Sequence, residues 1–359
     1  MLFHLRHETA RLQLAQAAVL FTWHVSDGDT VASGPWYWNG VAMRIALGLG
    51  LHRADKHLPV LDRIINKRLW WSIFVAEAFS ALETGRPSSI QLQDFDQDML
   101  QDDDFIDEQE IHRSQSSRGS SSHRSLQIRH HVCMVELAMI ILSVLELNSP
   151  ASRRKPDIAS INSTLAVWAL RSNCALGAQG DDFYTNHLRI HYNIVIMHLN
   201  RKIGVNATAD GRDVCSMASE AILSSLERIV KAGEIRRCHF STVGAVTAAG
   251  IQMVQDLRAA VVSQSFISAL SVSERLTQLI AHGDLLAEYW PNASAVTSVF
   301  SQLRNEYELH ISAGLNQAQL GDVDIESPDW NSLFASMDVP AYASLADHEW
   351  LGSTNLTGL

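Results

Sequence analysis

Cysteine, proline and charged residues are all scarce in this chain. Its 359 residues include four Cys and eight Pro, and Asp, Glu, Lys and Arg together make up 19%. Widely spaced cysteines without a CxxC pair exclude a disulfide framework and indicate buried thiols in a reducing compartment. Hydrophobic residues make up 47%, so the chain can bury a sizeable core and is not disordered along its whole length.

Positive charge is also in deficit. Lys and Arg number 28 against 39 Asp and Glu, which gives a formal net charge of −11. A surface that binds duplex DNA must displace counterions from phosphates, so this balance predicts no direct contact with nucleic acid. No stretch reaches ~18 apolar residues, which predicts no membrane span. The segment Met1–Trp23 alternates polar and apolar residues and therefore lacks the apolar core of a signal peptide.

Signatures of catalysis are absent as well. The sequence has no GxSxG elbow, P-loop or kinase motif set, and Gly48-x-Gly50 lies at a helix end rather than after a strand. The run Asp94-x-Asp96-x-Asp98 lacks the turn glycine and the chelating Glu of a calcium loop. We therefore expect no catalytic residue, no metal ligand and no cofactor in this chain, and we expect that it is not an enzyme.

Histidine and cysteine gather in three short stretches, which are His187/His191/His198, His130/His131/Cys133 and Cys238/His239. The first set shares one helical face by its spacing. None of the three supplies four ligands at the spacing of a zinc site. We interpret them as histidines with ordinary hydrogen-bond partners and as buried thiols.

Helical periodicity is what the chain has in abundance. Apolar residues recur at steps of three and four over 8–24, 35–50, 62–83, 126–147, 158–176, 181–201, 213–231, 240–262, 271–289 and 292–314. Strand-like alternation is not sustained anywhere. The fold class predicted by this pattern is all-α, an array of antiparallel amphipathic helices with polar connections.

Two segments depart from the helical pattern. Residues 94–125 combine an acidic run with a Ser/Arg/His stretch, which predicts an exposed, mobile loop. From Gly321 to the end there is no Lys or Arg, and seven acidic residues alternate with aromatic ones. We therefore expect a helical domain over 1–315 and a disordered acidic-aromatic tail over 316–359.

Two neighbouring stretches carry the most specific pattern. The first, Gly40–Arg53, ends in the letters LGLHR, and the second, beginning at Lys67, reads KRLWW and leads one helix later to GRP. Gly50 can adopt the left-handed conformation that ends a helix, after which His52 and Arg53 can cap or pair with the next helix.

The second stretch has its own structural expectations. Trp70 and Trp71 point about 100° apart on a helix, so their rings can touch two packing surfaces. Gly85-Arg86-Pro87 should stop the helix. The forked guanidinium of Arg86 suits carbonyls or a carboxylate, and Glu77 or an acid from Asp94 onward is the expected partner.

In order and spacing, these stretches resemble the middle regulatory domain of fungal zinc-cluster transcription factors. The stretch His187–Arg201 is similar to a later helix of that family. The chain departs from the family at Glu77-Ala78, where Asp-Arg is common. The motif residues carried over, with a structural or regulatory role, are Gly50, Leu51, His52, Arg53, Arg68, Trp70, Trp71, Gly85, Arg86 and Pro87.

The resemblance implies a function. The chain would be the regulatory and activating part of a nuclear regulator of transcription by RNA polymerase II. Its partners would be the transcription machinery or a second zinc-cluster activator, and it could take a small-molecule effector or form a homodimer. The tail would activate through its aromatic side chains, Trp330, Phe334, Tyr342 and Trp350.

The zinc cluster of the family has no counterpart among these residues. None of the four cysteines follows Cys-x2-Cys-x6-Cys spacing, so zinc would enter only through an upstream cluster in a full-length product. Either the part of the gene upstream of Met1 encodes that cluster, or the protein works through a partner. The alternative function is a small-molecule-binding module or an enzyme on the same helical scaffold.

Overall fold

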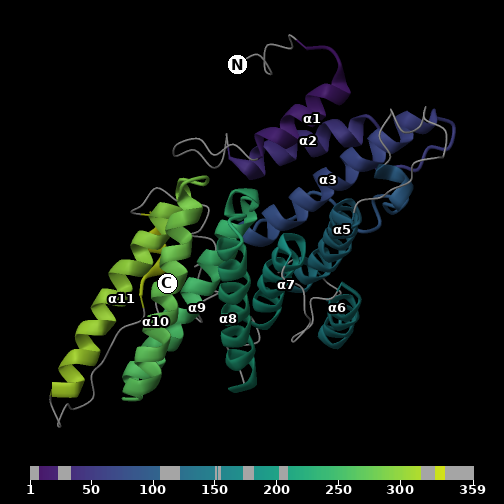
Figure 1. Ribbon diagram of the computed structural model, residues 1–359. Helices are drawn as coiled ribbons and strands as arrows, with labels where there is room; N and C mark the ends of the chain where they lie inside the picture. Colours follow the sequence, from purple (N-terminus) through teal and green to yellow (C-terminus); the bar gives the residue numbers. More distant parts are fainter. Residues whose placement is uncertain are drawn as a thin grey trace, which may run out of the picture. The chain divides into compact units, whose positions relative to one another are not determined.

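The computed structural model describes residues 8–22, 34–105, 122–149, 152, 155–172, 182–201, 209–316 and 328–335. Within these ranges the chain forms helices and no strand, which confirms the all-α prediction (Figure 1). The long helices are α1 (Arg11–Phe21), α2 (Pro35–Gly48), α3 (Val60–Thr84), α5 (Ser122–Asn148), α6 (Ile158–Ser172), α7 (Phe183–Arg201), α8 (Ala209–Lys231), α9 (Ser241–Val262), α10 (Phe266–Ala287) and α11 (Asn292–Asn316). Three short elements were not predicted, namely α12 (Trp330–Ala335) and the 3-10 turns η1 (Asp102–Phe105) and η3 (Ile235–Arg237).

The chain divides into two compact units. Unit 1 comprises Met1–Leu82 and Arg86–Gln179, and unit 2 comprises Glu83–Gly85 and Gly180–Leu359. The predicted boundary near residue 315, between a helical domain and a tail, stays a prediction. Residues 106–121 of the predicted mobile loop, and all of the tail except 328–335, lie outside the described residues.

Unit 1 is built from two helix pairs and the long helix α3. Helix α1 packs on α2, and α5 packs on α6. The indole Nε1 of Trp168 in α6 donates a hydrogen bond to the carbonyl oxygen of Cys133 in α5, at 3.1 Å. This bond satisfies the polar atom of a buried tryptophan and fixes how α6 lies on α5.

Helix α5 contains the one described stretch, Ser125–Asn148, that is long and apolar enough to cross a membrane. Leu137 and Ile141 within it are completely buried, as in the core helix of a globular protein, which passes the same test of length and composition. Because these apolar side chains already have protein neighbours, we interpret α5 as a core helix of unit 1.

In unit 2, consecutive helices from α7 to α11 pack side by side in an up-and-down arrangement (Figure 1). Helix α9 lies at the centre and contacts α7, α8, α10 and α11. Every residue from Ser241 to Val254 is buried. The stretch consists largely of Ala, Gly, Thr and Val, and small residues of this kind let neighbouring helices approach closely.

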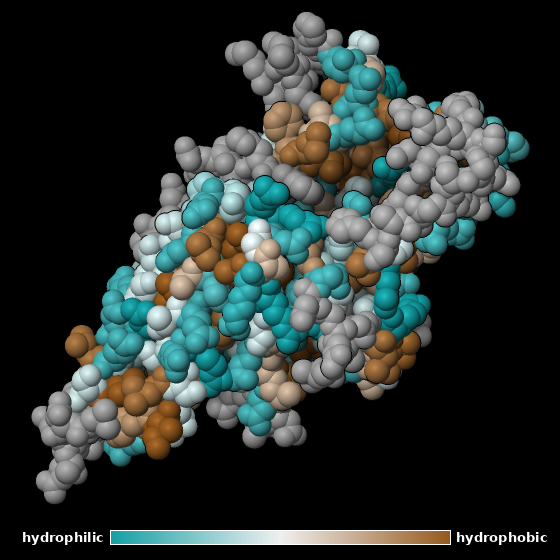
Figure 2. Space-filling model, in the orientation of Figure 1, coloured by the Kyte–Doolittle hydropathy of each residue, from teal (hydrophilic) through white to brown (hydrophobic). Residues whose placement is uncertain are grey.

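Unit 2 also exposes apolar side chains where α10 begins. Ile267 is 86% exposed and Leu270 is 53% exposed. Figure 2 shows apolar surface, in brown, at this end of α10. Exposed apolar residues of this size favour a surface that meets another molecule.

Candidate functional site

The LGLHR stretch ends α2 through a left-handed glycine. Gly50 has φ 74°. Its amide donates to the carbonyl of Leu47 at 3.1 Å, and the amide of Leu51 donates to the carbonyl of Ala46 at 3.0 Å. These two bonds form a Schellman motif, in which the buried side chain of Leu51 supplies the apolar contact. The glycine therefore has the structural role that its position in the sequence predicts.

Trp70 and Trp71 lie at the centre of an aromatic cluster in unit 1. Both are almost completely buried, at 0% and 1% exposure. Both rings contact Phe95, with centroids 5.7 and 5.6 Å away. Phe74 packs edge-on against Trp71 at 5.3 Å. The two indoles therefore share one cluster, whereas the sequence suggested two separate packing surfaces.

The partner of this cluster is the stretch 94–105, called the acidic segment below. The indole Nε1 of Trp71 donates to the carbonyl of Asp98 at 2.9 Å. From the acidic segment, Gln97 Nε2 donates to the carbonyls of Leu51 at 2.9 Å and of Arg53 at 3.0 Å. The LGLHR stretch and the WW pair thus hold the same segment from two sides.

Arg53 faces this segment, whereas His52 lies beside Trp70 of α3, the next helix. Arg53 Nη1 lies 3.5 Å from Asp96 Oδ2, and both side chains are more than 60% exposed, so the pair contributes little to stability. The His52 ring lies 6.0 Å from the Trp70 ring. Partial burial lowers the pKa of His52, and the neighbouring Arg53 lowers it further.

The basic residues before the tryptophans hold the far end of the acidic segment. Lys67 Nζ lies 2.7 Å from Asp104 Oδ2, and both side chains are only 12% exposed. The Arg68 guanidinium lies 5.9 Å from the Phe105 ring centroid, and that ring stacks on His131. A nearly buried ion pair is costly to break, since one charge is then left without its partner.

The GRP stretch ends α3 as predicted, with Gly85 at φ 64° and an exposed Pro87. Its arginine has a different partner from the one expected. The Arg86 guanidinium lies over the ring of Trp36, 4.4 Å from the centroid, and burial lowers its pKa. Cation–π stacking of this kind is a common use of arginine.

Glu77, the suggested partner of Arg86, is engaged elsewhere. One carboxylate oxygen accepts a hydrogen bond from Asn39 Nδ2 at 2.5 Å. The other accepts from the amide and the hydroxyl of Ser89, both at 2.6 Å. The expected pairing is therefore wrong, because Glu77 instead ties α2 and the chain after α3 to the middle of α3.

Of the four aromatic tail residues, the structure describes one side chain. Trp330 in α12 is 1% exposed, and its ring packs edge-on against Phe300 of α11, with centroids 6.4 Å apart. The side chain of Phe334 and the whole of Tyr342 and Trp350 lie outside the described residues. Their proposed activating role stays a prediction.

One histidine of α7, His191, is joined to α9 by a hydrogen bond. His191 Nδ1 lies 2.7 Å from the carbonyl oxygen of His187, and its Nε2 lies 2.6 Å from the hydroxyl of Ser241. A carbonyl only accepts, so the neutral ring carries its proton on Nδ1 and Ser241 donates to Nε2. Burial lowers the pKa of His191 to about 4, and burial also lowers that of His239, beside Ser241, to about 3. Both rings are therefore uncharged, and His191 links α7 to α9.

No three side chains of His, Cys, Asp and Glu come close enough to hold a metal ion within the described ranges. Cys133, Cys215 and Cys238 are buried on separate elements and form no disulfide among the described residues, and Cys174 lies outside those residues. Burial raises the pKa of Cys238 to about 12, so its thiol stays protonated. A zinc cluster needs several thiolates together, and these residues do not fit one. That the chain needs no cofactor stays a prediction.

Glu83, in the last turn of α3, is a buried carboxyl grouped with unit 2. Its side chain lies against α9 at Gly244, where an added Cβ would stand 3.1 Å from the carboxyl carbon. Oε1 has no hydrogen-bond partner among the described residues. Burial raises the pKa of Glu83 to about 8. This group could not be predicted from the sequence, because only the fold reveals its burial.

Replacing Glu83 by Gln should change how stability depends on pH. The folded state holds this proton up to about pH 8, while the unfolded chain releases it near its ordinary pKa of about 4.3. Wild-type stability should therefore fall as pH rises between these values, by up to about 1.4 kcal/mol per pH unit. Glu83→Gln should lose this slope and exceed the wild type at pH 8, as measured by urea unfolding at pH 5, 6.5 and 8.

The matched control is Glu227→Gln, which removes a carboxylate paired with Lys231 at the surface. Its pKa is lowered by that lysine, so its protonation changes below the tested range. The control should leave the slope unchanged. A Glu83→Gln variant with the wild-type slope would show that the carboxyl is ionised in the folded protein.

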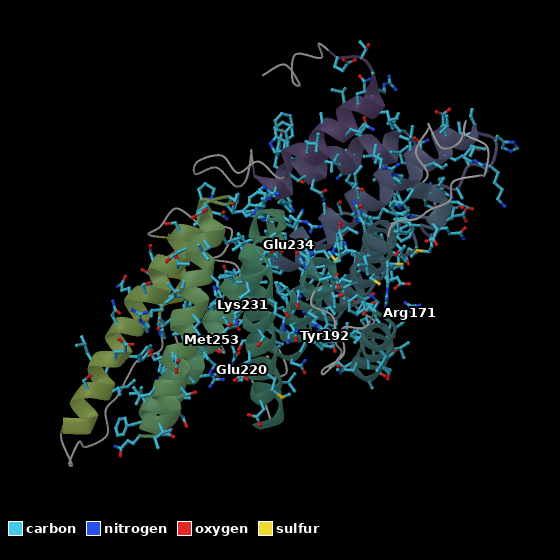
Figure 3. All side chains as sticks on the ribbon, viewed as in Figure 1. Arg171, Tyr192, Glu220, Lys231, Glu234 and Met253 are labelled. Carbon is cyan, nitrogen blue, oxygen red and sulfur yellow. The ribbon has the colours of Figure 1, made fainter. Side chains whose placement is uncertain are left out.

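A pocket of about 370 Å³ opens in unit 2 between α8, α9 and α10. Glu220 and Met253, which line it from α8 and α9, lie near one another in Figure 3. Asp213, Asp256 and Arg275 also line it, and Arg275 forms an ion pair with Glu220. With three carboxylates and one guanidinium the wall carries net negative charge, which suits small polar or cationic molecules.

The sequence of this chain is similar to those of known fungal regulators. Residues 1–170 match the fungal specific transcription factor domain, a range that contains all ten motif residues and nearly coincides with unit 1. The chain is 29% identical to the acetamidase regulatory protein of Aspergillus oryzae over 319 residues, which is 86% of this chain and 39% of that protein. No solved structure matches the chain.

Two other relatives also match most of this chain and less than half of their own length. The acetamidase regulatory protein of Emericella nidulans is 29% identical over 86% of this chain and 38% of its own length. Cutinase transcription factor 1 alpha of Fusarium vanettenii is 24% identical over 84% of this chain and 34% of its own length. This chain thus spans less than two fifths of the relatives that it matches. The resemblance seen in the motifs is confirmed: residues 1–170 match the fungal specific transcription factor domain, and most of the chain is similar to fungal transcription regulators.

Proposed function

We propose that this chain is the regulatory part of a nuclear regulator of transcription by RNA polymerase II. The observation that carries the proposal is similarity to the acetamidase regulatory protein over 86% of the chain, which extends through both units. The motif residues support a structural role for this stretch of the domain, because Trp70 and Trp71 are buried and the motif binds the acidic segment. The acidic net charge supports action through protein partners rather than through DNA contact by these residues.

The partners follow from the same reasoning. Transcription machinery or a second zinc-cluster activator would meet the acidic-aromatic tail, and the exposed apolar residues at the start of α10 offer a surface for such a partner or for a second copy. We propose no catalytic role and no bound cofactor.

The activating role of the tail can be tested by tethering. Residues 321–359 fused to a heterologous DNA-binding domain should activate a reporter gene. Acids keep bulky apolar side chains solvated and available to a partner, so replacing Trp330, Phe334 and Trp350 by Ala should abolish the signal. Ser332→Ala in the same segment should not. A fusion that is expressed and nuclear but inert would overturn the activating role and leave the family relationship intact.

A small-molecule effector is the second candidate, and the pocket between α8, α9 and α10 is the observation that favours it. A ligand that binds only the folded state raises the melting temperature in proportion to the logarithm of its concentration. We expect such a rise with diamines, which match the negative wall, and a smaller rise in the Asp256→Asn variant. Identical curves for both proteins would exclude this pocket as the site.

A further inference from the structure

The pocket of unit 2 is bordered by exposed apolar side chains as well as by carboxylates. Met217 of α8 is 53% exposed and lies one helical turn from both Asp213 and Glu220, which line the pocket. At the start of α10, where Figure 2 shows apolar surface, Ile267 is 86% exposed and precedes Ser268, another lining residue. These five residues form what we call the α8/α10 surface, in which two apolar side chains stand beside an acidic opening.

Helix α9 contributes one carboxylate and three apolar residues to the pocket. Met253 is buried, Ala259 and Ala260 have small side chains, and Asp256 accepts a hydrogen bond from Gln252 at 2.9 Å. The pocket volume of about 370 Å³ is within the range of sites that enclose a small ligand. A side chain with an aliphatic stem and a charged head, such as lysine, matches apolar walls that lead to carboxylates.

The protein's own Arg275 shows how this pocket holds a cation. Its guanidinium forms an ion pair with Glu220 and donates to the carbonyl and the hydroxyl of Ser271, at 3.3 and 3.4 Å. Of the residues that line the pocket, Arg275 is the one cation, whereas Asp213 and Asp256 add two further carboxylates. The wall therefore keeps a net negative charge, and a cationic group from another molecule would be attracted to it.

We propose that the α8/α10 surface binds a basic amphipathic helix of a protein partner, with one lysine of that helix entering the pocket. Residues three and four apart lie on one side of a helix, so apolar side chains beside the lysine would cover Met217 and Ile267. A second copy of this chain, with its net charge of −11, would be repelled by the acidic wall. The proposal rests on the proposed action through protein partners and adds a surface that is separate from the tail.

The test uses the full chain and a fluorescent synthetic peptide of about 20 residues, long enough to form a helix. Leucines and lysines are placed on one face of this peptide. Fluorescence anisotropy should show saturable binding that weakens as salt is added. Asp256→Asn and Ile267→Ser should each weaken binding by about tenfold, which corresponds to about 1.4 kcal/mol. The matched controls are Glu146→Gln and Leu170→Ser, exposed residues of unit 1, and they should leave binding unchanged.

A scrambled peptide of the same composition separates docking from general attraction to an acidic protein. Its lysines and leucines are spread around the helix, and it should bind about ten times more weakly. If both peptides bind equally well, or if Asp256→Asn and Ile267→Ser bind like the wild type, the proposal is wrong. It is also wrong if the helical peptide does not bind while a diamine raises the melting temperature, since the pocket would then be a site for small molecules. Each of these results leaves the activating role of the tail standing, because the tethering of residues 321–359 measures that role separately.

Discussion

Trp70→Ala should destabilise unit 1 more than any other single change considered for that unit. The indole is completely buried and lies against His52, Phe74 and Phe95. Truncating a buried tryptophan typically costs about 3–5 kcal/mol, since transfer energy is lost and a cavity remains. Whole domains are stable by only about 5–15 kcal/mol, so a large share of the stability of unit 1 should disappear. A urea titration followed by circular dichroism measures this loss.

The neighbouring Ser72→Ala serves as the matched control. Ser72 is exposed on the same helix, and its hydroxyl donates to the carbonyl of Arg68 one turn earlier. This change should alter stability by at most about 0.5 kcal/mol. If Trp70→Ala were as mild as the control, the aromatic cluster would not be the core of unit 1.

Replacing each tryptophan by Phe, a milder change, should show that the two indoles have different roles. Trp71→Phe removes the donor to the carbonyl of Asp98, whereas Trp70 Nε1 has no hydrogen-bond partner among the described residues. This bond is only partly buried, so losing it should cost about 0.5–1.5 kcal/mol. Trp71→Phe should therefore also speed hydrogen exchange in the acidic segment, and Trp70→Phe should not.

The sequence predicted the ten long helices because a buried helical face leaves a repeating apolar signal. Helix α10 shows the limit of that signal. It begins at Phe266, five residues before the predicted start, since the exposed Ile267 and Leu270 do not mark a buried face. Helix α12 was missed because six residues carry too little periodicity, and its stability comes from Trp330 meeting a residue thirty positions earlier.

For the motif residues, the sequence predicted the backbone conformation and not the side-chain contacts. Gly50 and Gly85 end their helices with positive φ, as glycine in those positions suggests. Side-chain partners were not predictable, because they depend on which distant segments meet. Arg86 stacks on Trp36 rather than pairing with Glu77, and Trp71 donates to a carbonyl 27 residues away. Every residue has a backbone carbonyl and every aromatic residue has a ring face, so the residue type alone does not identify such a partner.

In unit 2 the largest expected loss of stability comes from adding one methyl group at Gly250. A Cβ there would stand 2.1 Å from Cε2 and 2.3 Å from Cζ of Phe300. Both residues are completely or almost completely buried, so the ring can move only by displacing its own neighbours. Overpacking of this kind costs about 1–3 kcal/mol and occasionally more. Gly250→Ala should therefore lower the free energy of unfolding, measured by urea titration.

Gly40→Ala is the control that separates this clash from helix propensity. Gly40 also lies inside a helix, and an added Cβ there would meet nothing within 4 Å. Alanine favours a helix over glycine by up to about 1 kcal/mol, so the control should be stabilised while Gly250→Ala is destabilised. Equal effects at the two positions would show that the Phe300 ring does not lie over Gly250.

A second substitution at the clashing ring should restore part of the loss. Phe300→Leu removes the ring tip that the new methyl would strike, so the double variant should be more stable than additivity predicts. A methyl at Gly250 would also push Phe300 from the position against which Trp330 of α12 packs. The Leu333 amide donates to the carbonyl of Asp329 in α12. Gly250→Ala alone should therefore also accelerate hydrogen exchange at this amide, whereas Gly40→Ala should not. An additive double variant would mean that the lost stability comes from α9 itself and that the ring is not involved.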